Sequence, residues 1–340
     1  MEYVIGVDTG ASKSHLALFN TEGDLIDFRR WGPLNHEALP GSFDQFHEEL
    51  ERFVQKTLAK NNLTFDNITS AVFGIAGVDT KTQHGIVTDI IKEIGFKNFT
   101  LANDAFLGIP AGSPSGRGIC AINGSGSTIA GINNDGKTLQ IGGVGFISAD
   151  FGGGGMLGEM AVSAVYSELF RRGGRTSMTR ALMENLGVKD KHDFVDKISA
   201  KFDDGSLTAG ECNKMLFKAA LEDDKIAASI LRNCGKSYAD GISAMIDELD
   251  FASRGSDIHI VLAGSVFVKG ESPLIINTIK ENLKNEFPNE IFKYVILKVP
   301  PVAGAVFWAL CNLGINDKKR FYDKVLAQLG SVAQLSSVAS

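Results

Sequence analysis

A loop near the N-terminus combines residue types that can bind a phosphate and a metal ion. A short apolar strand, residues 3–8, ends in Asp8 and is followed by small residues at positions 10 and 11. A carboxylate at the end of a strand can hold hydrated magnesium, which takes few protein ligands. The small residues let the backbone approach an anion, Ser12 can donate a hydroxyl hydrogen bond, and Lys13 adds a positive charge. The loop therefore predicts an anion site with Asp8 as metal ligand, although an ordinary glycine-containing hairpin would show the same residues.

Two further turns of small residues follow later in the chain. The first loop joins two strands, whereas a Walker loop opens a helix and ends in Gly-Lys-Ser or Gly-Lys-Thr. A second strand-turn-strand unit spans residues 119–132, and a third turn follows the strand at 258–263. The turn residues are Gly124, Ser125, Gly126 and Ser127 in the second unit and Gly264 and Ser265 in the third. Two hairpins that bind phosphates and one turn beside a nucleoside would account for this ordered set.

Asp104 is a candidate for proton transfer and lies in sequence between the first two turns. It follows the strand at 99–103 and precedes a helix, where its carboxylate can reach into a cleft. A carboxylate there can act as general base and accept the proton of a hydroxyl that attacks a terminal phosphate. The alternative is a structural helix N-cap, a position at which Asp is favoured.

The elements that position these residues are strands and helices in alternation. Strands are expected at 3–8, 14–20, 24–31, 68–76 and 99–103, and helices at 42–60 and 80–94. The pattern is helical from 156 to 250, and a strand at 258–265, a helix at 272–287, a strand at 294–299 and a helix at 303–313 follow. An amphipathic helix near 318–329 is expected to pack on the first domain, and the tail after Ala327 is expected to fray. This order predicts an α/β protein with two mixed sheets that face one another.

Length and composition exclude several classes of protein. A chain of 340 residues is long enough for about two domains. The net charge of -6, without a run of Lys and Arg, argues against a nucleic-acid partner and favours a small molecule. We expect no membrane partner and a cytoplasmic location, because no leader or long apolar run is present. The four widely separated cysteines indicate neither a zinc site nor a disulfide framework.

Taken together, these segments resemble the actin-like ATPase superfamily of sugar kinases, and most closely its N-acetylglucosamine kinase family. The resemblance covers nearly the whole chain and is carried by the opening loop and by residues 32–36, 74–79, 103–105, 124–127, 142–145, 150 and 263–267. It implies two actin-like, ribonuclease H-like domains with mixed β-sheets flanked by helices and an active site in the interdomain cleft. The N-terminal domain would span 1–117, with a C-terminal helix at about 305–330 packed back on it. The C-terminal domain would span 118–304, with a helical insertion at 156–250.

The resemblance also implies an activity and a set of contacts. The activity is ATP-dependent phosphorylation of the 6-hydroxyl of N-acetylglucosamine or N-acetylmuramic acid by a homodimer that uses ATP and Mg²⁺. Asp104 would be the catalytic base and Asp8 the Mg²⁺ ligand. The nucleotide contacts would be Ser12, Lys13, Gly124, Ser125, Gly126, Ser127, Ala209, Gly264 and Ser265. The sugar contacts would be Asn35, Asp79, Asp104, Gly143, Val144, Gly145 and Asp150.

Local structure offers other roles for two of these residues, and the chain departs from the family pattern. Asn35 also suits a turn after Pro33, and Asp79 also suits the N-cap of a helix that begins at 80. Asp150 precedes Phe151 and four glycines where many family members have Asp-Glu-Gly-Ser, and Val144 replaces a common Trp. These changes remove bulk near the sugar, so the larger N-acetylmuramic acid becomes a serious candidate.

Three other functions stay open from the sequence. The first is a glucosamine kinase, whose substrate has no acetyl group for the protein to recognise. An ATPase activator of 2-hydroxyacyl-CoA dehydratases holds an iron-sulfur cluster between subunits through cysteines, and no second cysteine lies near Cys120 in sequence. A sugar-binding regulator without turnover would have no need for both Asp8 and Asp104.

Overall fold

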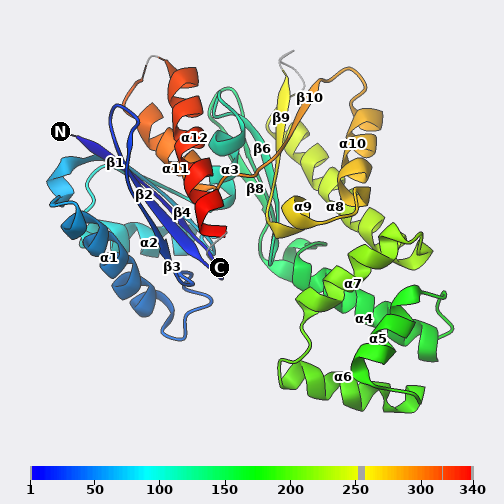
Figure 1. Ribbon diagram of the computed structural model, residues 1–340. Coiled ribbons are helices and arrows are strands. Elements are labelled where there is room, and N and C mark those ends of the chain that lie inside the picture. The colour runs from blue at the N-terminus through cyan, green and yellow to red at the C-terminus, as the bar shows by residue number, and fades with distance from the viewer. Residues whose placement is uncertain (1, 252–256, 316, 338–340) are drawn as a thin grey trace.

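The computed structural model describes residues 2–251, 257–315 and 317–337, and two five-stranded sheets form its framework (Figure 1). The first sheet has the strand order β3-β2-β1-β4-β5. Its strands are β1 (Tyr3–Thr9), β2 (Ser14–Asn20), β3 (Leu25–Trp31), β4 (Ile68–Ile75) and β5 (Phe99–Ala102). β1, β2 and β3 are antiparallel neighbours, whereas β4 and β5 extend the sheet in parallel with β1. The carboxyl ends of β1, β4 and β5 therefore meet at one edge of the sheet.

The second sheet repeats this plan with the order β10-β9-β6-β7-β8. Its strands are β6 (Gly118–Asn123), β7 (Ser127–Ile132), β8 (Thr138–Gly142), β9 (Ile258–Ala263) and β10 (Phe292–Ile296). β6, β7 and β8 are antiparallel neighbours, and β9 and β10 run parallel to β6. The predicted α/β class with two mixed sheets is confirmed.

Helices cover both faces of each sheet. On the first sheet, α1 (Ser42–Lys60) and α2 (Lys81–Ile94) cover one face, and α11 (Val302–Cys311) and α12 (Lys318–Ser337) cover the other. We call this group the first lobe. On the second sheet, α3 (Ala105–Gly112) packs on the face towards the first lobe, and α8 (Lys225–Glu248) and α10 (Leu274–Glu286) pack on the far face. We call the second sheet with α4 to α10 the second lobe, and α3 lies between the two (Figure 1).

The remaining helices are short or belong to an extension of the second lobe. The extension contains α4 (Gly154–Phe170), α5 (Ser177–Leu186), α6 (Phe194–Asp203) and α7 (Ala209–Leu221) (Figure 1). The short helices are α9 (Ser265–Lys269) and the 3₁₀ turns η1 (Phe65–Asn67), η2 (Gly145–Ser148) and η3 (Lys191–Asp193). Within the described ranges, no helix is both long and apolar enough to cross a bilayer.

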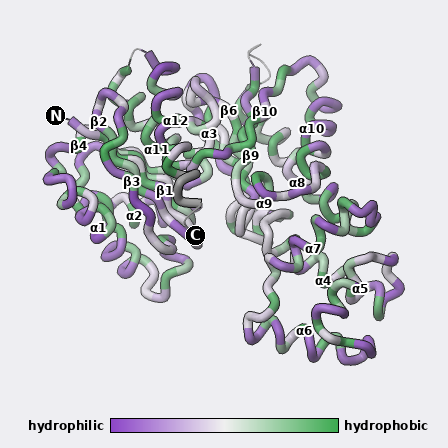
Figure 2. The backbone as a smooth tube through the Cα atoms, viewed as in Figure 1, coloured by the Kyte–Doolittle hydropathy of each residue, from purple (hydrophilic) through white to green (hydrophobic). Residues whose placement is uncertain are grey.

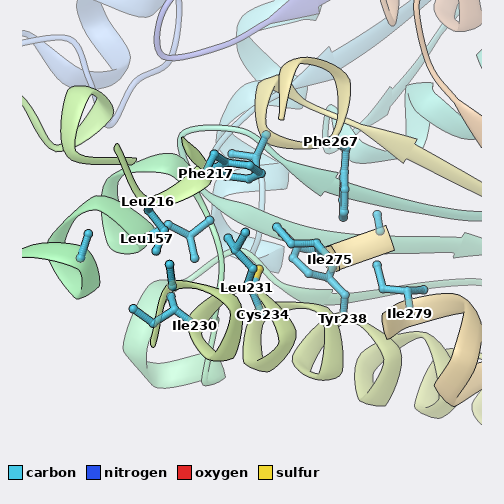
Figure 3. Packing of buried hydrophobic residues seen from close by; sticks show 14 of the residues in the cluster. Leu157, Leu216, Phe217, Ile230, Leu231, Cys234, Tyr238, Phe267, Ile275 and Ile279 are labelled. Atoms are coloured by element: carbon cyan, nitrogen blue, oxygen red, sulfur yellow. The ribbon is translucent and has the colours of Figure 1, made fainter. Parts of the chain in front are cut away.

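Hydrophobic residues are concentrated along the strands of both sheets, whereas hydrophobic and hydrophilic residues alternate along the outer helices (Figure 2). In the second lobe, Leu231, Cys234 and Tyr238 lie on one side of α8 at the spacing of successive helical turns. They pack in one cluster with Phe267 and Ile275, and all five are at most 5% exposed (Figure 3). This packing fixes α8 beneath the second sheet.

The structure differs from the sequence-based expectation at three elements. β8 and α9 were not predicted, because β8 is a short edge strand and α9 has only five residues. The prediction that the tail frays after Ala327 is wrong for residues 328–337, which continue α12. Residues 338–340 lie outside the described part of the chain. The helix persists because Val325 and Leu329 are fully buried in the core of the first lobe.

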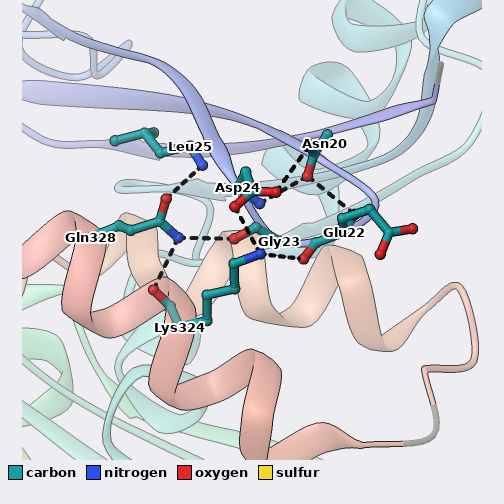
Figure 4. Close-up of polar contacts among 7 residues, drawn as sticks. All are labelled: Asn20, Glu22, Gly23, Asp24, Leu25, Lys324 and Gln328. Atoms are coloured by element: carbon teal, nitrogen blue, oxygen red, sulfur yellow. Dashed lines mark hydrogen bonds and ion pairs between the residues drawn. The ribbon is translucent and has the colours of Figure 1, made fainter.

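Polar contacts also hold α12 against the turn between β2 and β3 (Figure 4). Gln328 accepts a hydrogen bond from the backbone N of Leu25 at 2.8 Å and donates to the backbone O of Gly23 at 2.9 Å. Lys324 donates to the backbone O of Glu22 at 2.8 Å and pairs with Asp24 at 2.7 Å. The C-terminal helix therefore satisfies backbone groups of the hairpin that follows the first candidate phosphate loop.

We predict that Leu329→Ala lowers the free energy of unfolding by about 2–5 kcal/mol, because it leaves a cavity in this core. Urea unfolding followed by circular dichroism measures the change. The matched control is Ser331→Ala on the same helix, where an exposed hydroxyl bonds only to the backbone O of Ala327, and its effect stays within about 0.5 kcal/mol. Equal effects of the two variants would mean that α12 is not part of the folded core.

Candidate active site

Three carboxylates meet where β1, β4 and β5 end. Asp8 lies in β1 beside Gly74 of β4, and Gly74 lies beside Ala102 of β5. Asp79 follows β4 and Asp104 follows β5, so the parallel strands deliver both to the edge that carries Asp8. The negative charges of Asp8 and Asp79 act on Asp104, which places the three groups in one electrostatic environment.

Asp104 occupies the N-cap position of α3 but makes no side-chain capping hydrogen bond. The preceding residue does this work, because the Oδ1 atom of Asn103 accepts a hydrogen bond from the backbone N of Ala105 at 2.9 Å. Asp104 therefore holds the N-cap position without a capping hydrogen bond from its side chain, and its catalytic role stays a prediction. Burial, followed by the charges of Asp8 and Asp79, raises the pKa of Asp104 to about 7. A carboxyl group with this pKa is suited to accept a proton near neutral pH.

Asp79 is also not a helix cap. Thr80 is the N-cap of α2, and its hydroxyl accepts from the backbone N of Gln83 at 3.2 Å. The carboxylate of Asp79 instead accepts two side-chain amides at Oδ1, from Asn103 at 2.9 Å and from Gln140 at 2.5 Å. Burial raises the pKa of Asp79, the hydrogen bond from Gln140 opposes the shift, and the negative charges of Glu37 and Asp150 add to it.

Asn35 has the structural role that the sequence left open. Its Oδ1 atom accepts from the backbone N of Glu37 at 2.8 Å, which makes a side-chain-stabilised turn. The residue is 6% exposed, and the preceding Leu34 donates its backbone N to the backbone O of Gly10 at 3.0 Å. This orientation leaves Nδ2, a donor, as the atom of Asn35 that can face a ligand. The turn is thereby tied to the first phosphate loop.

The loop after β8 holds the remaining predicted sugar contacts. Asp150 accepts hydrogen bonds at Oδ2 from the backbone N of Gly143 at 3.0 Å and of Gly145 at 2.9 Å. Asp150 therefore shapes this loop. Gly143 has φ of +101°, and a Cβ atom there would lie 3.0 Å from the Oδ1 atom of Asp79, so the backbone closely approaches the first lobe. Val144 is partly exposed, and Phe146 in η2 is 89% exposed.

The second and third small-residue turns lie side by side. Gly264 has φ of +91°, and a Cβ atom there would lie 2.4 Å from the backbone O of Asn123. Gly154, the first residue of α4, donates its backbone N to the backbone O of Gly124 at 2.8 Å. The turn residues Ser125 and Gly126 are exposed, and so are Ser12 and Lys13 in the first loop. The predicted Ala209 begins α7, and its backbone O faces Gly158 of α4.

Asp8 is the predicted metal ligand. Its Oδ2 atom lies 3.5 Å from the Nδ1 atom of His15, and the Asp8 side chain is 14% exposed. Within the described residues, no group of three or more His, Cys, Asp and Glu side chains could hold a metal ion. One carboxylate is nevertheless a donor set that fits Mg²⁺, which keeps waters and takes oxygen atoms from substrate phosphates.

A pocket of about 540 Å³ lies beneath the loop after β8. Its lining includes Ile129 and Ile141, which pack in the same cluster as α8. Alternate residues of a strand point to opposite faces, so this pocket is on the far side of β7 and β8 from Gln140 and Asp79. The pocket and the edge of the sheet where the three carboxylates meet are therefore two separate places.

Sequence reasoning missed two polar residues that bind Asp79. Asn103 lies in the segment 103–105 that carries the family resemblance. Its place just before the helix could have indicated that Asn103, rather than Asp104, caps α3. Gln140 gave no local signal, because its role depends on how β8 lies against the first lobe.

Comparisons with known proteins agree with this arrangement. Residues 5–309 match the BadF/BadG/BcrA/BcrD ATPase family. The chain is 25% identical over 271 residues to an N-acetylmuramic acid/N-acetylglucosamine kinase of Clostridium acetobutylicum, covering 78% of this chain and 86% of that protein. It is 22% identical over 294 residues to an N-acetyl-D-glucosamine kinase of Dictyostelium discoideum, covering 84% and 92% of the two chains.

A solved structure shows the same fold. The crystal structure of a proposed N-acetylglucosamine kinase from Chromobacterium violaceum superposes with a TM-score of 0.64 at 20% identity, over 91% of this chain and 99% of that one. This likeness confirms the expected actin-like α/β architecture. Because the family match extends over most of its length, the chain belongs to the BadF/BadG/BcrA/BcrD ATPase family.

Proposed function

We propose that this protein is an ATP-dependent kinase that phosphorylates the 6-hydroxyl of an amino sugar, with N-acetylglucosamine as the leading substrate. The observation that carries the proposal is the carboxylate of Asp104, which caps no helix and lies beside Asp8 and Asp79. The relatives that are N-acetylglucosamine or N-acetylmuramic acid kinases support this choice of substrate class.

Asp104 acts as the general base in this proposal. Its carboxylate accepts the proton of the sugar hydroxyl as that oxygen attacks the terminal phosphorus of ATP, and the bond from phosphorus to the bridging oxygen breaks with ADP as leaving group. Burial, and after it the charge of Asp104, raises the pKa of the Cys120 thiol on β6, so the proposed base lies near the second lobe. The sugar would therefore be bound between the two lobes.

The two hairpin turns supply the contacts for the nucleotide. Backbone amides of residues 124–127 and the side chains of Ser12 and Lys13 can surround the phosphates of ATP, whose developing charge they neutralise. Ala209, Gly264 and Ser265 would lie beside the nucleoside. Asp8 would hold Mg²⁺, and the bound ion would supply charge neutralisation on the phosphate oxygens. A homodimer in the cytoplasm stays a prediction from the family resemblance.

The sugar would be held by donors and acceptors of both lobes. Asn35 offers its Nδ2 atom, and Asp79 offers its second carboxylate oxygen, since Oδ1 already accepts two amides. The loop at residues 143–145 offers its exposed side, because the backbone N atoms of Gly143 and Gly145 already donate to Asp150. Polar partners of this kind select a sugar, because a wrong ligand would leave them unpaired.

Glucosamine is the second candidate substrate. Acidic side chains lie at the predicted sugar site, since the negative charges of Glu37 and Asp150 both act on Asp79. A cationic amino group would be attracted there, whereas the carboxylate of N-acetylmuramic acid would be repelled. In this proposal, the anionic N-acetylmuramic acid therefore ranks below N-acetylglucosamine, which is uncharged, and glucosamine, which is cationic.

The cysteines argue against an iron-sulfur activator. Cys120, Cys212 and Cys234 are buried, and burial raises the pKa of the Cys234 thiol to about 12. A cluster shared between subunits needs accessible thiolates, so these three residues do not suit that role.

The proposal is tested by incubating the protein with ATP and Mg²⁺ and, in turn, N-acetylglucosamine, glucosamine, N-acetylmuramic acid and glucose. We expect ADP release to be fastest with N-acetylglucosamine or glucosamine, and phosphorus NMR to show a 6-phosphate product. Glucose is the control for the amino substituent. ADP release that no sugar increases would refute the proposal.

Asp104→Asn removes the base but keeps the size and polarity of the side chain. We expect kcat to fall by about 10²- to 10⁴-fold, the usual contribution of a general base, while the Kd for ATP changes little. Single-turnover kinetics and calorimetric ATP binding measure the two effects. Near-normal kcat in this variant would show that another group accepts the proton.

The pH dependence of the reaction follows from the raised pKa of Asp104. The base must be ionised, so kcat/KM rises as the pH increases through about 7 and is level above it. Asp79→Asn removes one of the two negative charges that raise this pKa, so the midpoint moves to lower pH even if the maximal rate falls. An unchanged midpoint in Asp79→Asn would contradict the assigned electrostatic coupling.

A further inference from the structure

Gln140 forms a side-chain hydrogen bond between the two lobes. It lies on β8 opposite Ala130 of β7, on the face of the second sheet that packs against α3 and the first lobe. Its Nε2 atom donates to the Oδ1 atom of Asp79 at 2.5 Å. Gly143 approaches the same carboxylate so closely that a side chain there would contact both Asp79 and Gln140. The hydrogen bond between Gln140 and Asp79 therefore lies where the two lobes pack closely together.

Two further hydrogen bonds connect Asp79 to the residues on either side of Asp104. The Oδ1 atom of Asp79 also accepts from the Nδ2 atom of Asn103 at 2.9 Å, and the Oδ1 atom of Asn103 accepts from the backbone N of Ala105 at 2.9 Å. Asn103 is 4% exposed, so it has little freedom to turn elsewhere. Asp104 lies between Asn103, whose side chain is held by these hydrogen bonds, and Ala105, whose backbone N donates one of them. A chain of three hydrogen bonds thus joins β8 to the backbone that carries Asp104.

An amide is the residue type that suits this position. The negative charges of Glu37 and Asp150 act on Asp79, and those of Asp8 and Asp79 act on Asp104, so another anion beside Asp79 would be repelled. The amide nitrogen of Gln140 donates to Asp79 without carrying a charge or titrating. The nearby His36 contacts Gln83 and stacks on Phe43, and it lies on the first lobe.

We propose that Gln140 is a positioning residue for phosphoryl transfer, which holds Asp79 from the second lobe and through Asn103 fixes the orientation of Asp104. This inference rests on the proposed kinase function. Gln140 does not accept the proton, and its contribution is to keep the base in one geometry when the lobes meet.

Gln140→Ala tests this role. A hydrogen bond to a charged group is lost, so we expect kcat to fall by about 10- to 100-fold while the KM for ATP stays within about 2-fold. Thr138→Ala is the matched control, because Thr138 is exposed, lies two residues earlier on the same face of β8, and should leave kcat unchanged. Equal kcat values in wild type and Gln140→Ala would overturn the proposal.

Gln140→Glu gives a readout that a merely structural role would not move. Ionised Glu repels Asp79, whereas protonated Glu has the same shape as Gln and can donate the missing hydrogen bond. The ratio of kcat in Gln140→Glu to kcat in wild type should therefore rise as the pH falls from 8 to 6. A ratio that does not change with pH would contradict the role of the donated hydrogen bond.

A separate measurement distinguishes failure of this inference from failure of the kinase proposal. The side-chain amide signals of Gln140 are assigned in nitrogen-15 NMR spectra by their loss in Gln140→Ala. They should shift in Asp79→Asn whether or not any sugar is phosphorylated. If the wild type phosphorylates no sugar, the kinase proposal fails and with it the role in transfer. If the signals do not shift, the bond between the lobes is refuted.

Discussion

The structure depends on bringing several carboxylates to one edge of a sheet without leaving them unpaired. Asp8, Asp79 and Asp104 arrive there because β1, β4 and β5 are parallel and in register. Burial raises the pKa values of Asp79 and Asp104, and neighbouring negative charges add to the effect. Neutral amides and a bound cation are the two means by which a protein offsets this repulsion. Asn103 and Gln140 provide the first, and Asp8 is placed to use the second.

The second lobe contributes a small-residue turn and the side chain of Gln140 to the candidate site. Its turn at residues 124–127 holds the position in the second sheet that the loop at 9–13 holds in the first, because the two sheets share one plan. Two positions need glycine for close packing: a Cβ atom at Gly143 would press on the carboxylate of Asp79, and one at Gly264 would collide with the backbone at Asn123. The same lobe contributes Gln140, so the environment of Asp79 is complete only where both lobes meet. Phosphoryl transfer needs mainly positioning and charge neutralisation, and this arrangement offers both.

The sequence predicted every strand of the described chain except β8, the small-residue turns and the aspartates that meet at one edge of the first sheet, because apolar runs and glycine turns are local signals. It did not decide whether Asp79 and Asp104 were helix caps, since that depends on competition with Thr80 and Asn103 for the same backbone amides. It assigned Asp150 to the sugar, which stays a prediction, and gave no local sign that the Oδ2 atom of Asp150 accepts the backbone amides of Gly143 and Gly145. Gln140 and the burial of Leu329 depend on contacts between segments far apart in the chain, and no local pattern reports them.

The central claim is that Asp104 is a base whose pKa is set by burial and by its neighbouring carboxylates. The most direct measurement is a titration of the Asp104 side-chain carboxyl carbon by carbon-13 NMR in the free protein, with the signal assigned from Asp104→Asn. The account predicts a midpoint near 7. A midpoint near the ordinary value of about 3.9 would contradict it, because the carboxyl would then be an ordinary solvated side chain.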